Sequence, residues 1–249
     1  MFALNVGANL YKVISTFSGC GGSSLGYQLA GFKIALAIEW DKNACETYRL
    51  NFPDTDLFEG DIANLSVDEA LKRTGLKAGE LDILDGSPPC QGFSTAGKRD
   101  FNDDRNQLFS EYIRLLKGLQ PKILVMENVS GMVKGKMKLI FAEILTELKA
   151  AGYNVKVKLL NAMYFGVPQS RQRLIFIGVR NDLNIEPVHP KAQTKPITVR
   201  EALKDCPDGL SQGGFTDKRL AIAKSIRQYR DDRNVIKGQS FNLLSLIHI

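Results

Sequence analysis

Short apolar runs alternate with amphipathic stretches through the first half of the chain. The apolar runs predict buried strands at residues 11–17, 33–40, 56–62, 81–86 and 122–128. The stretches between them predict helices at residues 21–31, 41–53, 66–75 and 107–119. Because apolar strands that alternate with helices form parallel sheets covered on both faces, the predicted fold class is α/β.

Two further strands are predicted after a helix near residues 136–151. They cover residues 153–162 and 173–180, and only a short loop joins them. Strands this close in the sequence usually pair antiparallel, because a parallel connection needs a long crossover. The predicted sheet is therefore mostly parallel, with one antiparallel strand pair and with helices on both faces.

The alternating pattern weakens in the last part of the chain. A helix is predicted within residues 197–205, and a charged helix within residues 217–233. No further alternation of strands and helices follows residue 207. We therefore assign residues 1–205 to one domain and residues 206–249 to the beginning of another region.

The composition is typical of a globular protein with a sizeable core. Hydrophobic residues make up 44% of the 249 residues, and no stretch approaches the roughly 20 apolar residues of a membrane span. The first residues lack the basic and apolar regions of a signal peptide. The four cysteines are scattered, which indicates reduced thiols in a cytoplasmic protein. The two histidines stand too far apart for a metal cluster.

The charge of the chain is distributed unevenly. Residues 1–119 contain 12 basic and 16 acidic side chains, whereas residues 120–249 contain 21 and 11, a net charge of +10. A basic half beside an acidic half suggests a polyanionic partner that binds mainly the second half. A solvated basic surface is the alternative, and the charge alone does not choose between them.

Glycines and polar groups stand where the first three predicted strands end. The first strand leads into FSGCGG, which lacks both the G-x-G-x-x-G spacing and the lysine of phosphate-binding loops. Glu39 ends the second strand, where an acid can hold ribose hydroxyls, and Asp61 ends the third. The alternatives are a surface glutamate, a helix-start aspartate and, for Trp40, a place in the core. Together these groups favour an adenosine-containing cofactor bound without phosphate contacts.

Cys90 follows the fourth strand, and therefore lies at the same edge of the predicted sheet. Pro88 and Pro89 stiffen the backbone before it. The connection at residues 87–105 is long, and such loops are usually functional or disordered. A lone cysteine is most often an inert buried residue, and no nearby histidine activates Cys90 as in a hydrolase. Glu127, at the end of the fifth strand, is instead suited to donate a proton to a substrate held between them.

The motifs FSGCGG, EWD, GDI, GSPPCQGFS, ENV and QSRQR occur in this order along the chain. In this order and context they resemble the cytosine-5 methyltransferases of DNA. The resemblance covers about residues 12–205, and residues 96–109 resemble the bacterial branch that modifies DNA. It implies a Rossmann-like fold that binds S-adenosylmethionine, with duplex DNA as substrate and a monomeric state. A restriction endonuclease as partner and an orphan or phage enzyme without one both stay open.

The resemblance also implies roles in the reaction. Cys90 attacks carbon 6 of a flipped-out cytosine, and Glu127 hydrogen-bonds ring nitrogen 3 and the exocyclic amine. Arg171 and Arg173, which alternate on one predicted strand, contact the ring oxygen and anchor the Cys90 loop or the DNA backbone. An exposed basic strand edge is the alternative for these two arginines. Further positions expected to contact nucleic acid are Gln91, Ser94, Lys98, Arg99 and Gln169.

Nine positions match the family's pocket for S-adenosylmethionine. Glu39 corresponds to the acid that holds the ribose, Trp40 packs against adenine, and Asp61 with Ile62 reaches the adenine edge. The glycine loop surrounds the methionine part. The complete set is Phe17, Gly19, Gly21, Glu39, Trp40, Asp61, Ile62, Pro89 and Leu108.

The family's pattern continues beyond what this sequence contains. A target-recognition region and two closing motifs are expected after residue 205, and neither motif is found, as in a truncated chain. The target DNA sequence is therefore not readable. Two rival hypotheses stay open: a methyltransferase that acts on cytosine in transfer RNA, and an inactive module that binds nucleic acid and cofactor.

Overall fold

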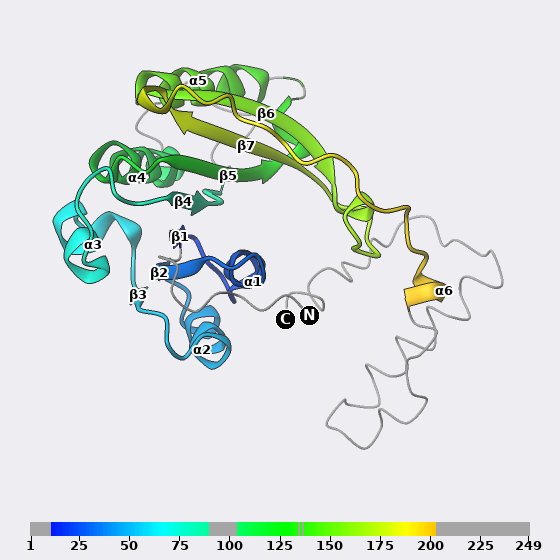
Figure 1. Ribbon diagram of the computed structural model, residues 1–249, viewed down its shortest axis with the longest axis horizontal. Coiled ribbons are helices and arrows are strands. Elements are labelled where there is room, and N and C mark those ends of the chain that lie inside the picture. The colour runs from blue at the N-terminus through cyan, green and yellow to red at the C-terminus, as the bar shows by residue number, and fades with distance from the viewer. Residues whose placement is uncertain (1–10, 90–103, 134, 136, 203–249) are drawn as a thin grey trace. The chain divides into compact units, whose positions relative to one another are not determined.

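A single seven-stranded sheet organises the structure, a computed structural model that describes residues 11–89, 104–133, 135 and 137–202. Its strand order is β3-β2-β1-β4-β5-β7-β6. The strands β1 to β5 are Lys12–Thr16, Lys33–Glu39, Leu57–Glu59, Ile83–Gly86 and Ile123–Val129. The last two are β6, Tyr153–Asn161, and β7, Gln172–Arg180 (Figure 1).

Five of the strands are parallel, and the sheet ends in an antiparallel part. β1 pairs parallel with β2 and β4, β2 with β3, and β4 with β5, whereas β7 runs antiparallel to β5. The amide of Asn181, after the end of β7, donates to the carbonyl of Gly152 before β6, so these neighbours also run in opposite directions. The predicted antiparallel pair is therefore confirmed.

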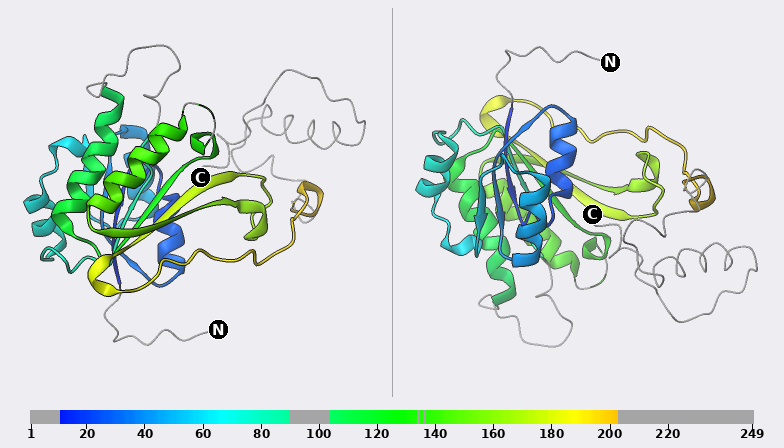
Figure 2. Two further views of the ribbon diagram at one scale, coloured as in Figure 1. Left: turned by 90° about the horizontal axis from the view of Figure 1, so that it is seen from above. Right: turned by 90° about the horizontal axis from the view of Figure 1, so that it is seen from below.

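Helices cover both faces of the sheet (Figure 2). On one face, Tyr27 of α1 and Tyr48 of α2 pack in a cluster with Val13 and Ile34. On the other face, α3, α4 and α5 pack with residues of the strands and loops in a larger cluster, in which Phe141 contacts Phe176 of β7. The helices are α1 Gly22–Leu29, α2 Lys42–Asn51, α3 Val67–Thr74, α4 Asp104–Leu119, α5 Met137–Ala150 and α6 Val199–Ala202.

Polar side chains cap the first turns of α2 and α3. The Asp41 carboxylate accepts a hydrogen bond from the Ala44 amide at 2.8 Å, and the Ser66 hydroxyl accepts one from Glu69 at 3.1 Å. Each supplies an acceptor to a first-turn amide that has no partner within the helix. The α4 helix begins at Asp104, three residues before the predicted start, and the helix predicted within 217–233 lies outside the described residues.

The chain divides into two compact units. The first contains the sheet and its helices and, in the described range, consists of residues 11–160 and 172–191. In the same range, the second consists of residues 161–171 and 192–202. Within the second unit, the Tyr164 carbonyl accepts hydrogen bonds from the amides of Gln193 and Thr194. The predicted boundary at residue 205 lies outside the described residues and stays a prediction.

Candidate active site

The loop between β1 and α1 turns through three residues with left-handed backbone. Phe17, Gly19 and Gly21 have φ values of 56°, 54° and 95°. A Cβ on Gly21 would lie 2.0 Å from the Phe52 ring, so only glycine fits there, whereas a Cβ on Gly19 would meet nothing within 4 Å. The left-handed conformation of Phe17 is unfavourable for a residue with a side chain, and such strain is common at functional sites.

Glu39 ties this glycine loop to the end of β2. Its carboxylate is 9% exposed and accepts hydrogen bonds from the amides of Gly19 at 2.7 Å, Trp40 at 2.9 Å and Asp41 at 3.0 Å. A carboxylate has about four acceptor positions, so Glu39 keeps capacity for a hydroxyl donor. Trp40 is 72% exposed, which rules out the alternative that it belongs to the core.

The other predicted cofactor positions differ in how exposed their side chains are and in what these side chains contact. Asp61 is exposed and also caps a short 3-10 turn, because its Oδ1 accepts from the Ala63 amide at 2.9 Å. Ile62 is 3% exposed and packs in the larger core cluster, so its side chain faces the core and only its backbone remains for a ligand. Pro89 is exposed, and Leu108 is half-buried against the same cluster.

The turn that leads to Cys90 is held by β5. Pro88 is buried, and its carbonyl accepts a hydrogen bond from Nδ2 of Asn128 at 3.1 Å. Oδ1 of Asn128 accepts from the Val129 amide at 2.8 Å, and the side chain is 4% exposed. Two residues before Pro88, a Cβ on Gly86 would lie 2.3 Å from Oγ1 of Thr16, so close packing also fixes the start of this turn.

We expect replacement of Asn128 by alanine to lower the free energy of unfolding by about 1–3 kcal/mol, because the buried Pro88 carbonyl loses its donor. Urea denaturation measures this change. Asn154→Ala is the control, since that amide bonds Glu186 at the surface and its loss should have an effect within about 0.5 kcal/mol. Equal losses in the two variants would contradict the role of Asn128.

Glu127 and Arg173 form an ion pair across β5 and β7. Nε of Arg173 lies 2.5 Å from Oε1 of Glu127, and the side chains are 26% and 35% exposed. The register explains the contact, because Glu127 pairs with Ile175 and Arg173 stands two residues earlier, on the same face. The sequence placed both residues at the site, but it did not indicate that they pair with each other.

The expectation that Arg171 and Arg173 share one strand is wrong for Arg171. The β7 strand begins at Gln172, and the chain before it bends, since the amide of Gln169 donates to the Val167 carbonyl and that of Arg171 to the Gln169 carbonyl. Arg171 and Gln169 belong to the second unit. The predicted residues Cys90, Gln91, Ser94, Lys98 and Arg99 lie outside the described residues.

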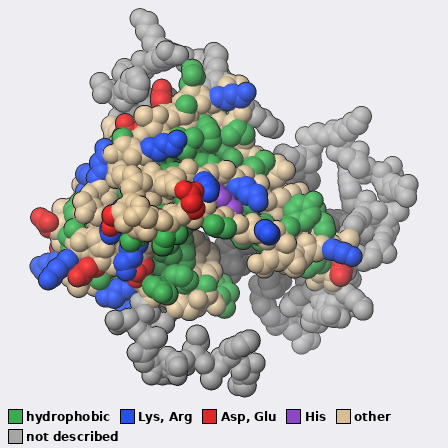
Figure 3. Space-filling view, turned by 45° about the horizontal axis from the view of Figure 1, so that its top comes forward, with side chains coloured by type: hydrophobic (Ala, Val, Ile, Leu, Met, Phe, Trp, Pro, Cys, Tyr) green, Lys and Arg blue, Asp and Glu red, His purple; other side chains and the backbone are tan. Residues whose placement is uncertain are grey.

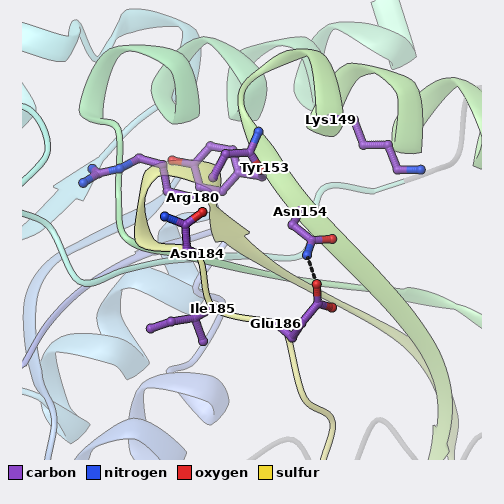
Figure 4. Close-up of a pocket in the computed structure, with 8 residues that line it drawn as sticks. Lys149, Tyr153, Asn154, Arg180, Asn184, Ile185 and Glu186 are labelled. Carbon is purple, nitrogen blue, oxygen red and sulfur yellow. Dashed lines mark hydrogen bonds between the residues drawn. The ribbon is translucent and has the colours of Figure 1, made fainter.

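A polar hollow of about 600 Å³ lies at the opposite edge of the sheet, where β7 ends and β6 begins (Figure 4). Nδ2 of Asn154 donates to Oε1 of Glu186 at 3.0 Å there, and Lys149 and Arg180 also line it. None of the predicted site residues lies in this hollow.

Within the described ranges, the helices lack the length and apolarity that crossing a bilayer requires.

Charges on the face seen in Figure 3 are mixed. Lysine and arginine side chains are interspersed with aspartate and glutamate there, so this face does not form a patch of one sign. The described residues also include no group of three or more side chains that could hold a metal ion.

The glycine loop, Glu39 and the Glu127–Arg173 pair all lie at the carboxyl edge of a mostly parallel sheet, which is where α/β enzymes bind their ligands. The chain belongs to the C-5 cytosine-specific DNA methylase family, whose family model matches residues 11–244.

Relatives and solved structures agree with this family. The chain is 45% identical over 187 residues to the type II methyltransferase M1.HphI of Haemophilus parahaemolyticus, covering 73% of this chain and 50% of that protein. It is 40% identical over 205 residues to M.NgoPII of Neisseria gonorrhoeae, covering 80% and 58%. The chain thus spans between half and three-fifths of the length of these two relatives.

Two solved structures show the same fold. One is described as a DNA modification methyltransferase encoded within an Escherichia coli prophage, with a TM-score of 0.68 and 33% identity over 80% of this chain and 56% of that chain. The other is DNMT2 of Spodoptera frugiperda, with a TM-score of 0.60 and 29% identity, covering 75% and 57%. The predicted Rossmann-like methyltransferase fold is therefore confirmed.

Proposed function

We propose that this chain transfers a methyl group from S-adenosylmethionine to carbon 5 of cytosine in duplex DNA. The observation that carries the proposal is the Glu127–Arg173 ion pair, which stands at the carboxyl edge of the sheet in a chain of the DNA methylase family. Asn128, the residue after Glu127, holds the turn that leads to Cys90. Relatives named type II methyltransferases support DNA as the substrate and a restriction endonuclease as the partner.

The residues around the glycine loop fit S-adenosylmethionine. Glu39 retains acceptor capacity for a ribose hydroxyl, the exposed Trp40 ring offers a stacking surface, and Gly19 faces open space. The α1 helix begins without a side-chain cap, so its first amides remain donors for a carboxylate. When bound, S-adenosylmethionine supplies an electrophilic methyl group next to this edge.

The protein's own groups activate the base. The Cys90 sulfur forms a bond to carbon 6 of the flipped-out cytosine, which pushes electrons toward carbon 5. Glu127 hydrogen-bonds ring nitrogen 3 and stabilises the charge that develops in the ring, while Arg173 orients Glu127 and contacts the carbonyl oxygen at carbon 2 of cytosine. After carbon 5 gains its methyl group, it loses its proton, and the bond from carbon 6 to sulfur breaks.

Trapping with 5-fluorocytosine tests the proposal. Fluorine at carbon 5 cannot leave as a proton does, so the covalent adduct accumulates. We would incubate the chain with labelled S-adenosylmethionine and duplex DNA that carries 5-fluorocytosine in varied contexts, and then separate a denaturation-resistant adduct. We expect an adduct that forms at particular DNA sequences and that Cys90→Ala abolishes. We also expect the protein that forms it to be a monomer.

The other outcomes separate the alternatives. An adduct with transfer RNA and none with DNA would assign the enzyme to RNA. Binding of the cofactor without any adduct on either substrate would support a binding module. An adduct that persists in Cys90→Ala would overturn the proposed nucleophile.

A further inference from the structure

A buried acid that the proposed reaction does not use lies between β4, β1 and α1. Asp85 is 9% exposed, and its carboxylate accepts hydrogen bonds from the hydroxyls of Ser15 at 3.3 Å and Tyr27 at 3.2 Å. The Ser23 hydroxyl, in the first turn of α1, also bonds this carboxylate and lies 3.4 Å from that of Ser15. The hydroxyls come from both elements that flank the glycine loop.

Asp85 lies on the same face of the sheet as Glu127, the acid of the proposed reaction. Asp85 pairs with Ser15 of β1 and with Val125 of β5, and Glu127 stands two residues beyond Val125, so the three acidic or hydroxyl side chains point to one face. One residue after Asp85, the chain reaches Gly86 and then the turn before Cys90. Asp85 thus stands between the loop expected to hold the cofactor and the edge expected to hold cytosine.

No cation compensates the charge of Asp85 in the part of the chain that the structure describes. The titratable groups that face it are Tyr27 from α1 and Glu127 from β5, while Tyr112 of α4 lies near it on the other face of the sheet, where its hydroxyl donates to the Leu84 carbonyl. Burial, opposed by the hydroxyl donors and assisted by the charge of Glu127, raises the pKa of Asp85 to about 6. The acid is therefore ionised at pH 7.5 without an ion-pair partner, which is an unfavourable arrangement for stability alone.

We propose that Asp85 is a positioning residue, which rests on the proposed function: its carboxylate holds the hydroxyls of Ser15, Ser23 and Tyr27 and so fixes the cofactor loop against the strand that carries the reactive turn. An acceptor-only group suits this task, because all three partners can donate to it at once. An amide of the same shape would offer one acceptor and two donors, and would disturb at least one of these bonds.

Stability and positioning should respond in opposite directions to Asp85→Asn. The folded pKa of about 6 exceeds the unfolded value, so stability contributed by this group is present below pH 4 and is lost as the pH rises to about 6. The difference corresponds to up to about a hundredfold in the folding equilibrium. At pH 7.5 the neutral variant avoids the buried charge, and this gain should exceed the loss of about one hydrogen bond, so the variant should unfold less readily than the wild type.

Hydrogen exchange measures the positioning directly. We expect the amides of residues 17–24 to exchange about tenfold faster in Asp85→Asn than in the wild type, although the variant is globally more stable. The affinity for S-adenosylmethionine, followed by the fluorescence of Trp40, the one tryptophan of the chain, should fall about tenfold. In the wild type this affinity should also fall below about pH 6, and in the variant it should not.

Asp82→Asn is the matched control. Asp82 lies three residues earlier, where its carboxylate bonds the amide of Lys12 at 2.8 Å and the ammonium of Lys122 at 2.7 Å. This variant should lose stability and leave both the loop exchange and the cofactor affinity unchanged. Tyr27→Phe, which removes one donor and keeps the ring, should reproduce a smaller part of the Asp85→Asn effect.

The outcomes separate this proposal from the proposed function. Unchanged exchange at residues 17–24 in Asp85→Asn would overturn the positioning role, whatever the activity. If Asp85→Asn lost stability and cofactor affinity in proportion, the role of Asp85 would be structural only. This result would also overturn the positioning role. Faster loop exchange in a protein that binds no S-adenosylmethionine would support the positioning role and refute the proposed cofactor.

Discussion

Replacing Glu127 with glutamine is expected to slow adduct formation with 5-fluorocytosine DNA by about 100- to 1000-fold. Glutamine keeps the shape of the side chain, but it cannot carry the charge that pairs with Arg173 at 2.5 Å, and it cannot exchange a proton with ring nitrogen 3. The affinity for S-adenosylmethionine should stay unchanged, because Glu127 lies on β5 and the glycine loop follows β1. Single-turnover trapping and cofactor titration measure the two quantities.

The same chemical change at Glu39 provides the reciprocal test. The Glu39 carboxylate accepts hydrogen bonds from three amides, one in the glycine loop and two just after β2. Glu39→Gln should therefore lower the cofactor affinity by about tenfold or more. At saturating cofactor its rate of adduct formation should remain closer to that of the wild type. Glu147→Gln, on the surface of α5, should change neither quantity. Parallel losses of rate and affinity in Glu127→Gln and Glu39→Gln would contradict the separate roles.

Gly21→Ala is expected to lower the free energy of unfolding by about 3 kcal/mol or more. Two effects add: the backbone has a φ of 95°, which a side chain disfavours, and the new Cβ would lie 2.0 Å from the Phe52 ring. Phe52 is 5% exposed and packs 4.7 Å from Tyr48, measured between ring centroids, so the ring has little room to move. Urea denaturation followed by circular dichroism gives the value.

Gly19→Ala is the control in the same loop. Its φ is 54°, but a Cβ there would meet nothing within 4 Å, so the loss of stability should be about 1 kcal/mol. If Gly19 faces the cofactor, this variant should lose more cofactor affinity than stability. Equal destabilisation by the two substitutions would show that backbone strain alone, and not contact with Phe52, makes Gly21 necessary.

Local sequence patterns were sufficient to predict most of the helices and strands. Apolar runs and helical spacing identified the strands and helices that the structure describes, because the period of burial differs between a strand and a helix. The predicted helices at residues 41–53 and 66–75 each begin with a residue that caps them, Asp41 and Ser66, because a helix start needs an acceptor for its free amides. The start of α4 was missed by three residues, since helix ends depend on contacts as well as on sequence.

Roles that depend on side-chain direction were predicted less well. Ile62 belongs to a cofactor motif, yet its side chain packs in the core, because a motif specifies the chain position and not the direction in which each side chain points. Arg171 was placed on the strand of Arg173, but bends before Gln172 exclude it from β7. Alternation predicts one face only for residues that are in the strand.

The sequence by itself determined the α/β class, and it was sufficient to predict a cofactor site at the glycine loop, Glu39 and Trp40 and to propose Glu127 as the acid of the site. Only the tertiary structure decided that β7 inserts between β5 and β6, that Arg173 pairs with Glu127, and that Asp85 joins β4 to the hydroxyls of β1 and α1. The physical reason is that these contacts arise between segments 46 to 70 residues apart. Strand order and register bring them together, and no local pattern of apolar and polar positions contains that information.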